Sequence, residues 1–322
     1  MIAIRDIAAE RGEKREGWLE IGETASGPLR MPVVLIHGRE DGPTLCVTAG
    51  VHATEYAPID AVMRLLRMLD PQRLRGTVIG VPVTNMRMFE HRTGFTSPLD
   101  GLNLNRIAPG RQDGSISELL ADVLLREVIA RAQYHIDFHA GDLGEQLLPF
   151  AGYSLTGRRD LDAQGEALAR AFTPRLISLA TEESTLPPFA GSLNFAATRM
   201  GVVSILAEAG GNGTLEERDV QIHLDGAENV MRALGMIDGR TQDGPRIAAR
   251  DRTVIRAKRS GLVRLKVAIG DEITLGQEIA EIVGVFGDTV ERVTSSGAGI
   301  VGLIWTHKVV NTGDPIVRYW IT

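Results

Sequence analysis

The sequence has little of what several large protein classes require. Cys46 is the single cysteine, so the chain can form no internal disulfide and has no cysteine cluster that could hold a metal. Aromatic residues make up only 5% of the chain, too few for the stacking platforms of single-strand binders. No apolar run approaches the roughly 18 residues that a membrane span needs. We therefore expect neither disulfides nor a membrane span.

The charge balance also argues against a nucleic-acid partner. The chain has 35 basic and 41 acidic residues, a net charge of -6, whereas nucleic-acid binders usually show a basic excess. Residues 1–22 alternate charged and apolar side chains and lack the apolar core of a signal peptide. Hydrophobic residues at 43% and charged residues at 24% are typical of globular proteins. We expect a cytoplasmic globular protein, with no nucleic acid or membrane as its partner.

Short apolar runs alternate with helical patterns through the first two thirds of the chain. Residues 76–83 (GTVIGVPV) are a strand-like run, whereas residues 58–69 place apolar side chains at helical spacing. Buried strands separated by helices are typical of an α/β domain with a mostly parallel sheet. The predicted strands are 32–37, 44–51, 76–83, 134–140 and 202–207, and the predicted helices are 58–69, 116–132 and 219–234.

The pattern changes after residue 236. Residues 238–246 (DGRTQDGPR) contain two glycines and a proline, as a linker would. Beyond them, short strand-like runs are separated by glycines, and a Ser-Gly pair followed by a Gly-Asp pair occurs twice. We therefore predict two domains, an α/β domain over residues 1–240 and a smaller all-β domain over residues 241–322.

Three residues that suit a metal ion lie at or beside predicted strand ends. His52 and Glu55 are three positions apart between a strand and a helix, so a turn can aim both at one point. Imidazole and carboxylate are zinc ligands, and hydrolytic zinc usually has three protein ligands. His139 is the best third candidate, because ligands gather at the carboxyl ends of strands in α/β sheets. The simpler reading makes His52 a surface histidine and Glu55 a helix cap.

Other polar residues are placed where hydrolysis would need them. Asp137 shares a strand face with His139 and can fix its tautomer, unless it only caps the strand end. Glu208 follows an apolar strand and precedes two nearby glycines, a suitable place for a general base. Arg106, which follows Asn105 in a polar loop, can hold a substrate carboxylate, or it forms a surface ion pair. Together these residues suggest a hydrolytic metal site.

Four motifs in this order resemble those of the succinylglutamate desuccinylase/aspartoacylase family, a branch of the zinc carboxypeptidase superfamily. They are GVHATE at 50–55, NLNR at 103–106, DFHAGD at 137–142 and LAEAGGNG at 206–213, and the resemblance covers about residues 25–235. It implies a zinc carboxypeptidase-like α/β fold. It also implies one Zn²⁺ per chain held by His52, Glu55 and His139, a general acid/base at Glu208, and a carboxylate-binding pair at Asn105 and Arg106.

The resemblance further implies an upstream arginine that stabilises the oxyanion. Arg92, in EHRTGF, is our choice, and Arg87 remains open. Many relatives have aspartate where this sequence has Asn103.

Residues 270–282 resemble the lipoyl-type, barrel-sandwich pattern of the β domain that follows the catalytic domain in bacterial deacylases, but no lysine has the setting of a carrier lysine. We expect this domain to shape the mouth of the active site or to form an oligomer contact.

The resemblance implies a zinc-dependent deacylase that hydrolyses the amide bond of small N-acyl amino acids. Acetyl, succinyl and other short acyl groups are all open, and N-acetyl diaminobutyrate is one candidate substrate. A metallocarboxypeptidase or an esterase would use the same site. A non-catalytic protein that binds a metabolite is the alternative from another class. A serine hydrolase is not expected, because the sequence has no G-x-S-x-G motif, and Cys46 lies in an apolar strand, where we expect a core residue.

Overall fold

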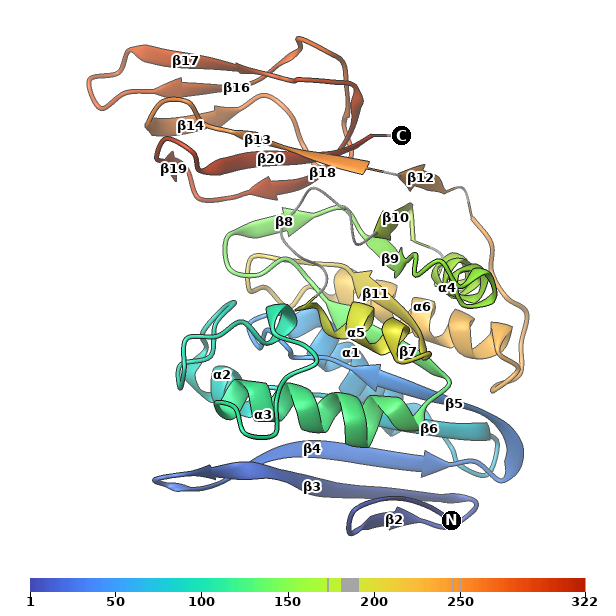
Figure 1. The fold of residues 1–322 in the computed structure, drawn as a ribbon. Helices are drawn as coiled ribbons and strands as arrows, with labels where there is room; N and C mark the ends of the chain where they lie inside the picture. The colour runs from blue at the N-terminus through green and yellow to red at the C-terminus, as the bar shows by residue number, and fades with distance from the viewer. Residues whose placement is uncertain (173, 181–190, 245, 250, 322) are drawn as a thin grey trace.

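The computed structural model describes residues 1–172, 174–180, 191–244, 246–249 and 251–321. A nine-stranded sheet forms its centre, in the order β12-β10-β9-β11-β7-β5-β6-β4-β3 (Figure 1). Five of the eight neighbouring pairs in this sheet are parallel, which confirms the mixed, mostly parallel sheet. Its strands are β3 (Glu13–Thr24), β4 (Gly27–His37), β5 (Glu40–Thr48), β6 (Arg75–Val81), β7 (Tyr134–His139), β9 (Phe150–Ser154), β10 (Leu176–Ala180), β11 (Val203–Glu208) and β12 (Ile247–Ala249).

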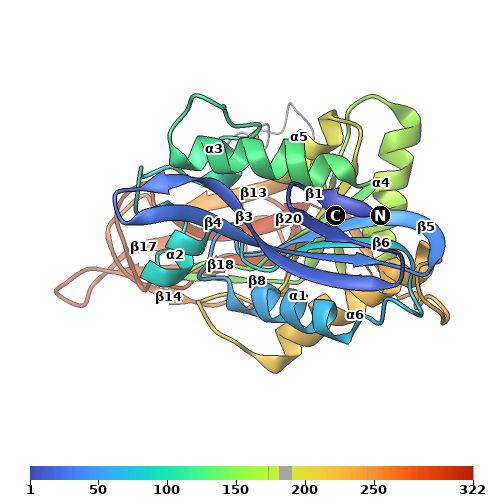
Figure 2. The same cartoon turned by 90° about the horizontal axis from the view of Figure 1, so that it is seen from below.

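Helices cover both faces of this sheet, and strand alternation explains why. In β5, Leu45 and Val47 belong to one apolar cluster, whereas Cys46 between them belongs to the cluster on the other face. Helices α1 (Tyr56–Met68), α4 (Arg159–Ala171) and α6 (Glu217–Ala233) pack into the first cluster. Helices α3 (Ile116–Val123) and α5 (Leu193–Arg199) pack into the second, and Figure 2 shows α3 and α1 on opposite sides of the sheet. Among the described residues, none of the helices has the length and apolar character that a membrane crossing requires.

The predicted elements exist, with differences in their bounds and character. The predicted helix over 116–132 is regular only to Val123 and continues through π-helical and 3-10 turns to Arg131. Cys46 is fully buried, as predicted, and burial raises the pKa of its thiol. Elements that were not predicted include the hairpin of β1 (Ile2–Ile4) and β2 (Ile7–Ala9), β3, α2 (Met86–His91), the 3-10 turn η1 (Leu104–Arg106), β8 (Glu145–Leu147), β9, α4, β10, α5 and β12.

The last part of the chain contains only strands, in two antiparallel sheets. One sheet has the order β13-β20-β18-β15, and the other has the order β17-β16-β14-β19. A separate apolar cluster, which includes Val317 and Tyr319, forms the core of this part. Its strands are β13 (Asp251–Arg256), β14 (Gly261–Leu265), β15 (Glu272–Ile273), β16 (Glu278–Val283), β17 (Thr289–Thr294), β18 (Gly299–Trp305), β19 (Val309–Val310) and β20 (Pro315–Ile321).

Strand pairs that cross between the two parts of the chain, together with a buried tryptophan, hold these parts together. Strand β12 pairs with β10 of the large sheet, and β8 pairs with β18 of the C-terminal strands. Trp320 is fully buried, donates through Nε1 to Ser178 Oγ at 3.2 Å, and lies 5.4 Å from the Phe150 ring centre. Because apolar burial and a hydrogen bond both hold this contact, the C-terminal strands have a fixed position beside the large sheet.

His223 makes the free energy of unfolding depend on pH. It is fully buried on α6, donates through Nε2 to the Ala209 carbonyl at 3.1 Å, and packs against Phe138 at a ring distance of 5.3 Å. Burial lowers its pKa from 6.5 to about 4. The unfolded chain therefore binds a proton between these values that the folded chain does not bind. The stability that this group contributes is complete above pH 6.5 and is lost as the pH falls toward 4.

We expect the free energy of unfolding to fall by about 2 kcal/mol between about pH 7.5 and about pH 5 through this group alone. Urea unfolding at the two pH values measures the change. His223→Gln should show a smaller fall than the wild type, whereas His91→Gln, at an exposed position, should show the same fall as the wild type. Equal falls in the wild type and His223→Gln would contradict the assignment.

Candidate metal and catalytic site

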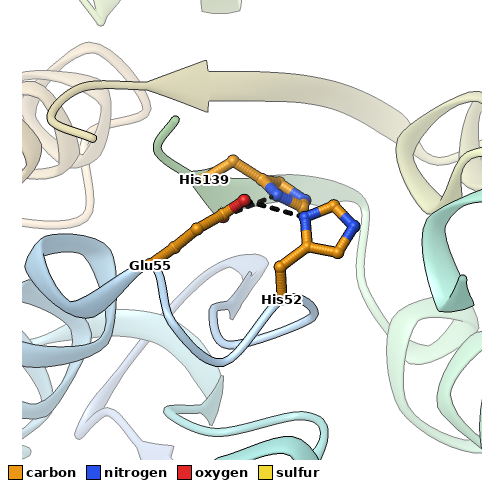
Figure 3. A group of neighbouring side chains, drawn as sticks. All are labelled: His52, Glu55 and His139. Carbon is orange, nitrogen blue, oxygen red and sulfur yellow. Dashed lines mark hydrogen bonds and ion pairs between the residues drawn. The ribbon is translucent and has the colours of Figure 1, made fainter. Parts of the chain in front are cut away.

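Three side chains meet at the carboxyl ends of the central strands. His52 and Glu55 leave the turn between β5 and α1, and His139 ends the neighbouring strand β7 (Figure 3). Glu55 lies between the two imidazoles, with Oε1 2.8 Å from His52 Nδ1 and Oε2 2.9 Å from His139 Nδ1. All three residues are buried, and their candidate ligand atoms lie within 4.8 Å of one another. The structure therefore brings the three predicted residues into one group that could hold a metal ion.

The outer nitrogen of each imidazole has its own acceptor. His139 Nε2 donates to Asp137 Oδ2 at 3.2 Å, and His52 Nε2 donates to Asn103 Oδ1 at 3.1 Å. When Nε2 carries the proton, Nδ1 of each ring presents a lone pair toward the Glu55 carboxylate. Two imidazole nitrogens and one carboxylate are a donor set that suits zinc. The residues present therefore fit a divalent metal. The contact between Asn103 and His52 was not predicted from the sequence.

The charges of this group attract a positive charge to its centre. Burial alone would raise the pKa of Glu55, but His139 and His52 outweigh it and lower the pKa to about 2. Burial opposes the protonation of His139, yet Glu55 and Asp137 raise its pKa well above the usual value. The anionic carboxylate of Glu55 thus lies beside His139, which binds a proton more tightly than usual. A divalent cation would satisfy the same attraction.

Glu208 is the last residue of β11 and lies opposite His139 in the pairing of β11 with β7. Its Oε2 atom is buried and has no hydrogen-bond partner among the described residues. Burial raises the pKa of Glu208 well above its usual value, the carboxylates of Glu55 and Glu145 raise it further, and His139 opposes them. A buried carboxyl oxygen without a partner, on the wall of a pocket, can take up and release a proton.

The NLNR motif places two of its residues at the same pocket. Asn105 is buried, its Oδ1 accepts from the Leu193 backbone N–H at 2.9 Å, and its Nδ2 lies 3.4 Å from His139 Nε2. Arg106 lines the pocket, is partly exposed to solvent, and donates through Nη1 to the Asn105 carbonyl at 2.7 Å. Gly191 packs against this turn so closely that a Cβ would come 2.1 Å from the Arg106 carbonyl oxygen. A residue with a side chain at position 191 would therefore displace the turn that carries Arg106.

Asp142, the last residue of the DFHAGD motif, connects the loops around the site. It is fully buried and accepts hydrogen bonds from the Thr54 hydroxyl and from the Phe95 backbone N–H, the latter at 2.6 Å. The Phe95 ring packs edge-to-face on His52, with ring centres 5.5 Å apart. Asp142 thus holds the loop that carries Phe95 against the histidine.

The two arginines considered for the oxyanion do not lie in the pocket. Arg92 is exposed at the end of α2 with a φ of 56°, and it is absent from the described residues that line the pocket. Arg87 pairs with Glu90 at 2.9 Å and is likewise absent from that lining. Phe95, three positions after Arg92, does line the pocket and packs on His52.

One wall of the pocket comes from residues that the sequence did not predict. Glu145 from β8, Leu303 from β18, Arg252 from β13 and Arg318 from β20 line the pocket together with the predicted residues. In β20, Val317 and Tyr319 point into the core of the C-terminal strands, so Arg318 between them points out toward the pocket. The sequence contains one signal for Arg318, because an arginine stands there among the apolar residues of a strand.

Comparisons with known proteins found a family model and relatives that match large parts of this chain. The family model of the succinylglutamate desuccinylase/aspartoacylase catalytic domain matches residues 41–234. N-alpha-acetyl-L-2,4-diaminobutyric acid deacetylase from Halomonas elongata is 31% identical over 303 residues, which are 91% of this chain and 86% of the relative. Succinylglutamate desuccinylase from Ectopseudomonas mendocina is 26% identical and covers 76% of this chain and 74% of its own. The product-bound ectoine utilization protein EutE from Ruegeria pomeroyi has the same fold, with a TM-score of 0.90, 24% identity and 98% of each chain covered.

Proposed function

We infer the reaction from one premise, that this chain belongs to the succinylglutamate desuccinylase/aspartoacylase family. We propose that it is a zinc-dependent deacylase that hydrolyses the amide bond of small N-acyl amino acids. The observation that carries the proposal is the buried group of His52, Glu55 and His139 beside Glu208 Oε2, which has no partner among the described residues. Relatives that are named as a deacetylase and a desuccinylase support the class of reaction.

In this proposal, His52 and His139 would hold one Zn²⁺ through Nδ1 and Glu55 through its carboxylate. When bound there, zinc would supply Lewis acidity that makes a water molecule easier to deprotonate. Asp137 and Asn103 accept the Nε2 protons of the histidines and so keep both rings oriented toward Glu55.

Glu208 is the proposed general base and general acid. It takes the proton of the attacking water and passes it to the nitrogen of the leaving amine, so that the amide carbon gains an oxygen as the C–N bond breaks. Arg106, held next to Asn105, binds the α-carboxylate of the amino-acid half by a bidentate pair. Arg92 remains our proposal for the oxyanion donor, and this role requires its side chain to turn toward the pocket.

We also propose the domain division that the sequence predicts, with a catalytic domain over residues 1–240 and a β domain of barrel-sandwich type over residues 241–322. Pocket residues from β13, β18 and β20 support a role of the β domain at the mouth of the active site.

Release of free amine from a panel of substrates tests the function. The panel consists of N-acetyl and N-succinyl amino acids, N-alpha-acetyl-L-2,4-diaminobutyrate, peptides with a free C-terminus, and acyl esters. The proposal expects turnover of one or more N-acyl amino acids by the zinc-loaded protein, with a kcat/KM well above that for peptides and esters. Turnover of peptides alone or esters alone would replace it with a peptidase or an esterase. Binding of the panel without turnover would replace it with a metabolite-binding protein.

A further inference from the structure

A line of buried polar side chains runs behind His139, on the sheet face that α5 covers. Its members are each at most 1% exposed, and they are Ser204, His135, Thr48 and Asp137. Strand pairing brings them together: Ser204 of β11 lies opposite His135 of β7. Thr48 of β5 lies opposite Asp137, two positions further along β7. Of the four, only Asp137 has a role in the proposed mechanism, so the other three need an explanation.

Hydrogen bonds connect these side chains without a break. Asp137 Oδ2 accepts from His139 Nε2 at 3.2 Å, and its Oδ1 accepts from the Thr48 hydroxyl at 2.7 Å. The Thr48 hydroxyl oxygen also lies 2.9 Å from His135 Nε2. His135 Nδ1 in turn lies 2.8 Å from the Ser204 hydroxyl. Both oxygens of Asp137 and both ring nitrogens of His135 therefore have partners.

The carboxylate of Asp137 sets the direction of every bond in this line. A carboxylate only accepts, so the Thr48 hydroxyl gives its one hydrogen to Asp137 and can only accept from His135. Burial lowers the pKa of His135 to about 4, so the ring is uncharged at neutral pH and carries one N–H. That hydrogen is therefore on Nε2, and Nδ1 accepts from the Ser204 hydroxyl.

This line fixes the plane of the Asp137 carboxylate. The torsion that turns a carboxylate has broad minima, so a hydrogen bond to one oxygen alone leaves the plane free to turn. The bond from Thr48 fixes the second oxygen, and the bond from His135 keeps the hydroxyl hydrogen of Thr48 directed at Asp137. The Nε2–H of His139 then has its acceptor in one place, which keeps Nδ1 directed at Glu55.

We propose that His135 and Thr48 are positioning residues for the metal site. His135 directs the hydroxyl hydrogen of Thr48 to Asp137, and the carboxylate so fixed holds His139 with Nε2 protonated and Nδ1 ready to bind the metal. The inference rests on the proposed zinc site and adds two residues that contact neither metal nor substrate. A purely structural role would make both residues matter for the free energy of unfolding but not for zinc affinity.

Two substitutions of Thr48 test its bond to Asp137. Thr48→Val keeps the shape of the side chain and removes the hydroxyl, whereas Thr48→Ser keeps the hydroxyl. We expect Thr48→Val to bind zinc about 10- to 100-fold more weakly than the wild type and Thr48→Ser to stay within about threefold of it. Competition with a chromogenic chelator measures the affinity. Zinc binding by Thr48→Val that is as tight as in the wild type would refute the role of Thr48.

Two substitutions of His135 test whether Thr48 needs its donor. Glutamine can place an amide N–H near the position of Nε2, whereas leucine offers no donor. We expect His135→Leu to weaken zinc binding about 10-fold and His135→Gln to recover most of that loss. The control is Thr198→Val, because Thr198 is buried and its hydroxyl donates to the Asn194 carbonyl within α5, outside this line. The control should lower stability and leave zinc affinity unchanged; an equal loss of zinc in the control and in His135→Leu would overturn the proposal.

The tautomer of His135 tests the direction of the line in the wild-type protein, without any substitution. Heteronuclear NMR of the histidine rings distinguishes a proton on Nε2 from one on Nδ1, and the spectrum of His135→Gln assigns the signal. We expect a proton on Nε2 of His135 in both the metal-free and the zinc-loaded protein. A proton on Nδ1 would overturn the proposal, because Thr48 would then give its hydrogen to His135 and not to Asp137.

Together these measurements separate this inference from the proposed function. If Thr48→Val weakens zinc binding and His135 carries its proton on Nε2, but no N-acyl amino acid is hydrolysed, the positioning role is supported and the deacylase proposal falls. If hydrolysis occurs but Thr48→Val and His135→Leu bind zinc as tightly as the wild type, the positioning role falls and the deacylase proposal remains.

Discussion

Glu208→Gln is expected to lower kcat by about 10²- to 10⁴-fold, because general acid-base catalysis by a positioned side chain is worth about that factor. Glutamine keeps the size and polarity of the side chain but cannot take a proton from water at neutral pH. Glu208 is outside the group of candidate ligands, so the variant should bind as much zinc as the wild type. Single-turnover rates and metal content, measured on the same preparation, check both expectations.

The matched control for this variant is Glu272→Gln. Glu272 is exposed on β15 and is absent from the described pocket lining, so its kcat should equal that of the wild type. If Glu208→Gln retains zinc and more than about a tenth of the wild-type kcat, another group moves the proton. In that case, Glu145 would be the next carboxylate to test, because it lines the same pocket.

Arg106→Ala is expected to raise KM by about 100-fold while changing kcat much less. The α-carboxylate carries the same charge in the substrate and in the transition state. Arg106 therefore stabilises both equally, so its loss weakens substrate binding more than it slows the chemical step. Loss of a charged bidentate partner is worth about 2–5 kcal/mol in binding, which agrees with such an increase. Steady-state kinetics on the preferred N-acyl amino acid give the two constants separately.

A substrate whose α-carboxylate is converted to an amide is the control for Arg106. The wild type should already turn it over with a raised KM, and Arg106→Ala should raise that KM no further. Arg106→Lys should lie between the wild type and the alanine variant, since it keeps the charge without the planar fork. An unchanged KM in Arg106→Ala would place the carboxylate anchor elsewhere in the pocket.

Local sequence patterns predicted the parts of the fold that are buried on both faces. Strands such as β7 and β11 are short and apolar, and each ends in a polar residue that reaches the site, His139 and Glu208. Strand β3 was not predicted, because it lies at the edge of the sheet and many of its side chains are exposed and charged. The sequence likewise could not show that β12 joins the large sheet, because this pairing depends on contacts distant in sequence.

The residues of the candidate site likewise fall into those that local sequence patterns predicted and those that depend on tertiary contacts. His52 and Glu55 are close in sequence, and His139 and Asp137 share a strand, so spacing alone was enough to group them. Asn103 and Asp142 act through loops whose folding follows from tertiary contacts. Arg318 comes from the far end of the chain, and only the docking of β20 through Trp320 brings it to the pocket.

The most direct measurement for the whole account is zinc content per chain, by elemental analysis, of the wild type, His139→Ala and His91→Ala in parallel. His139 contributes one of the three candidate ligands, whereas His91 is an exposed histidine outside the group. The account predicts about one zinc per chain in the wild type and in His91→Ala, and a loss of most of it in His139→Ala. A wild-type protein that binds no zinc after the metal is added, or a His139→Ala variant that keeps all of it, would contradict the proposed metal site and the hydrolysis built on it.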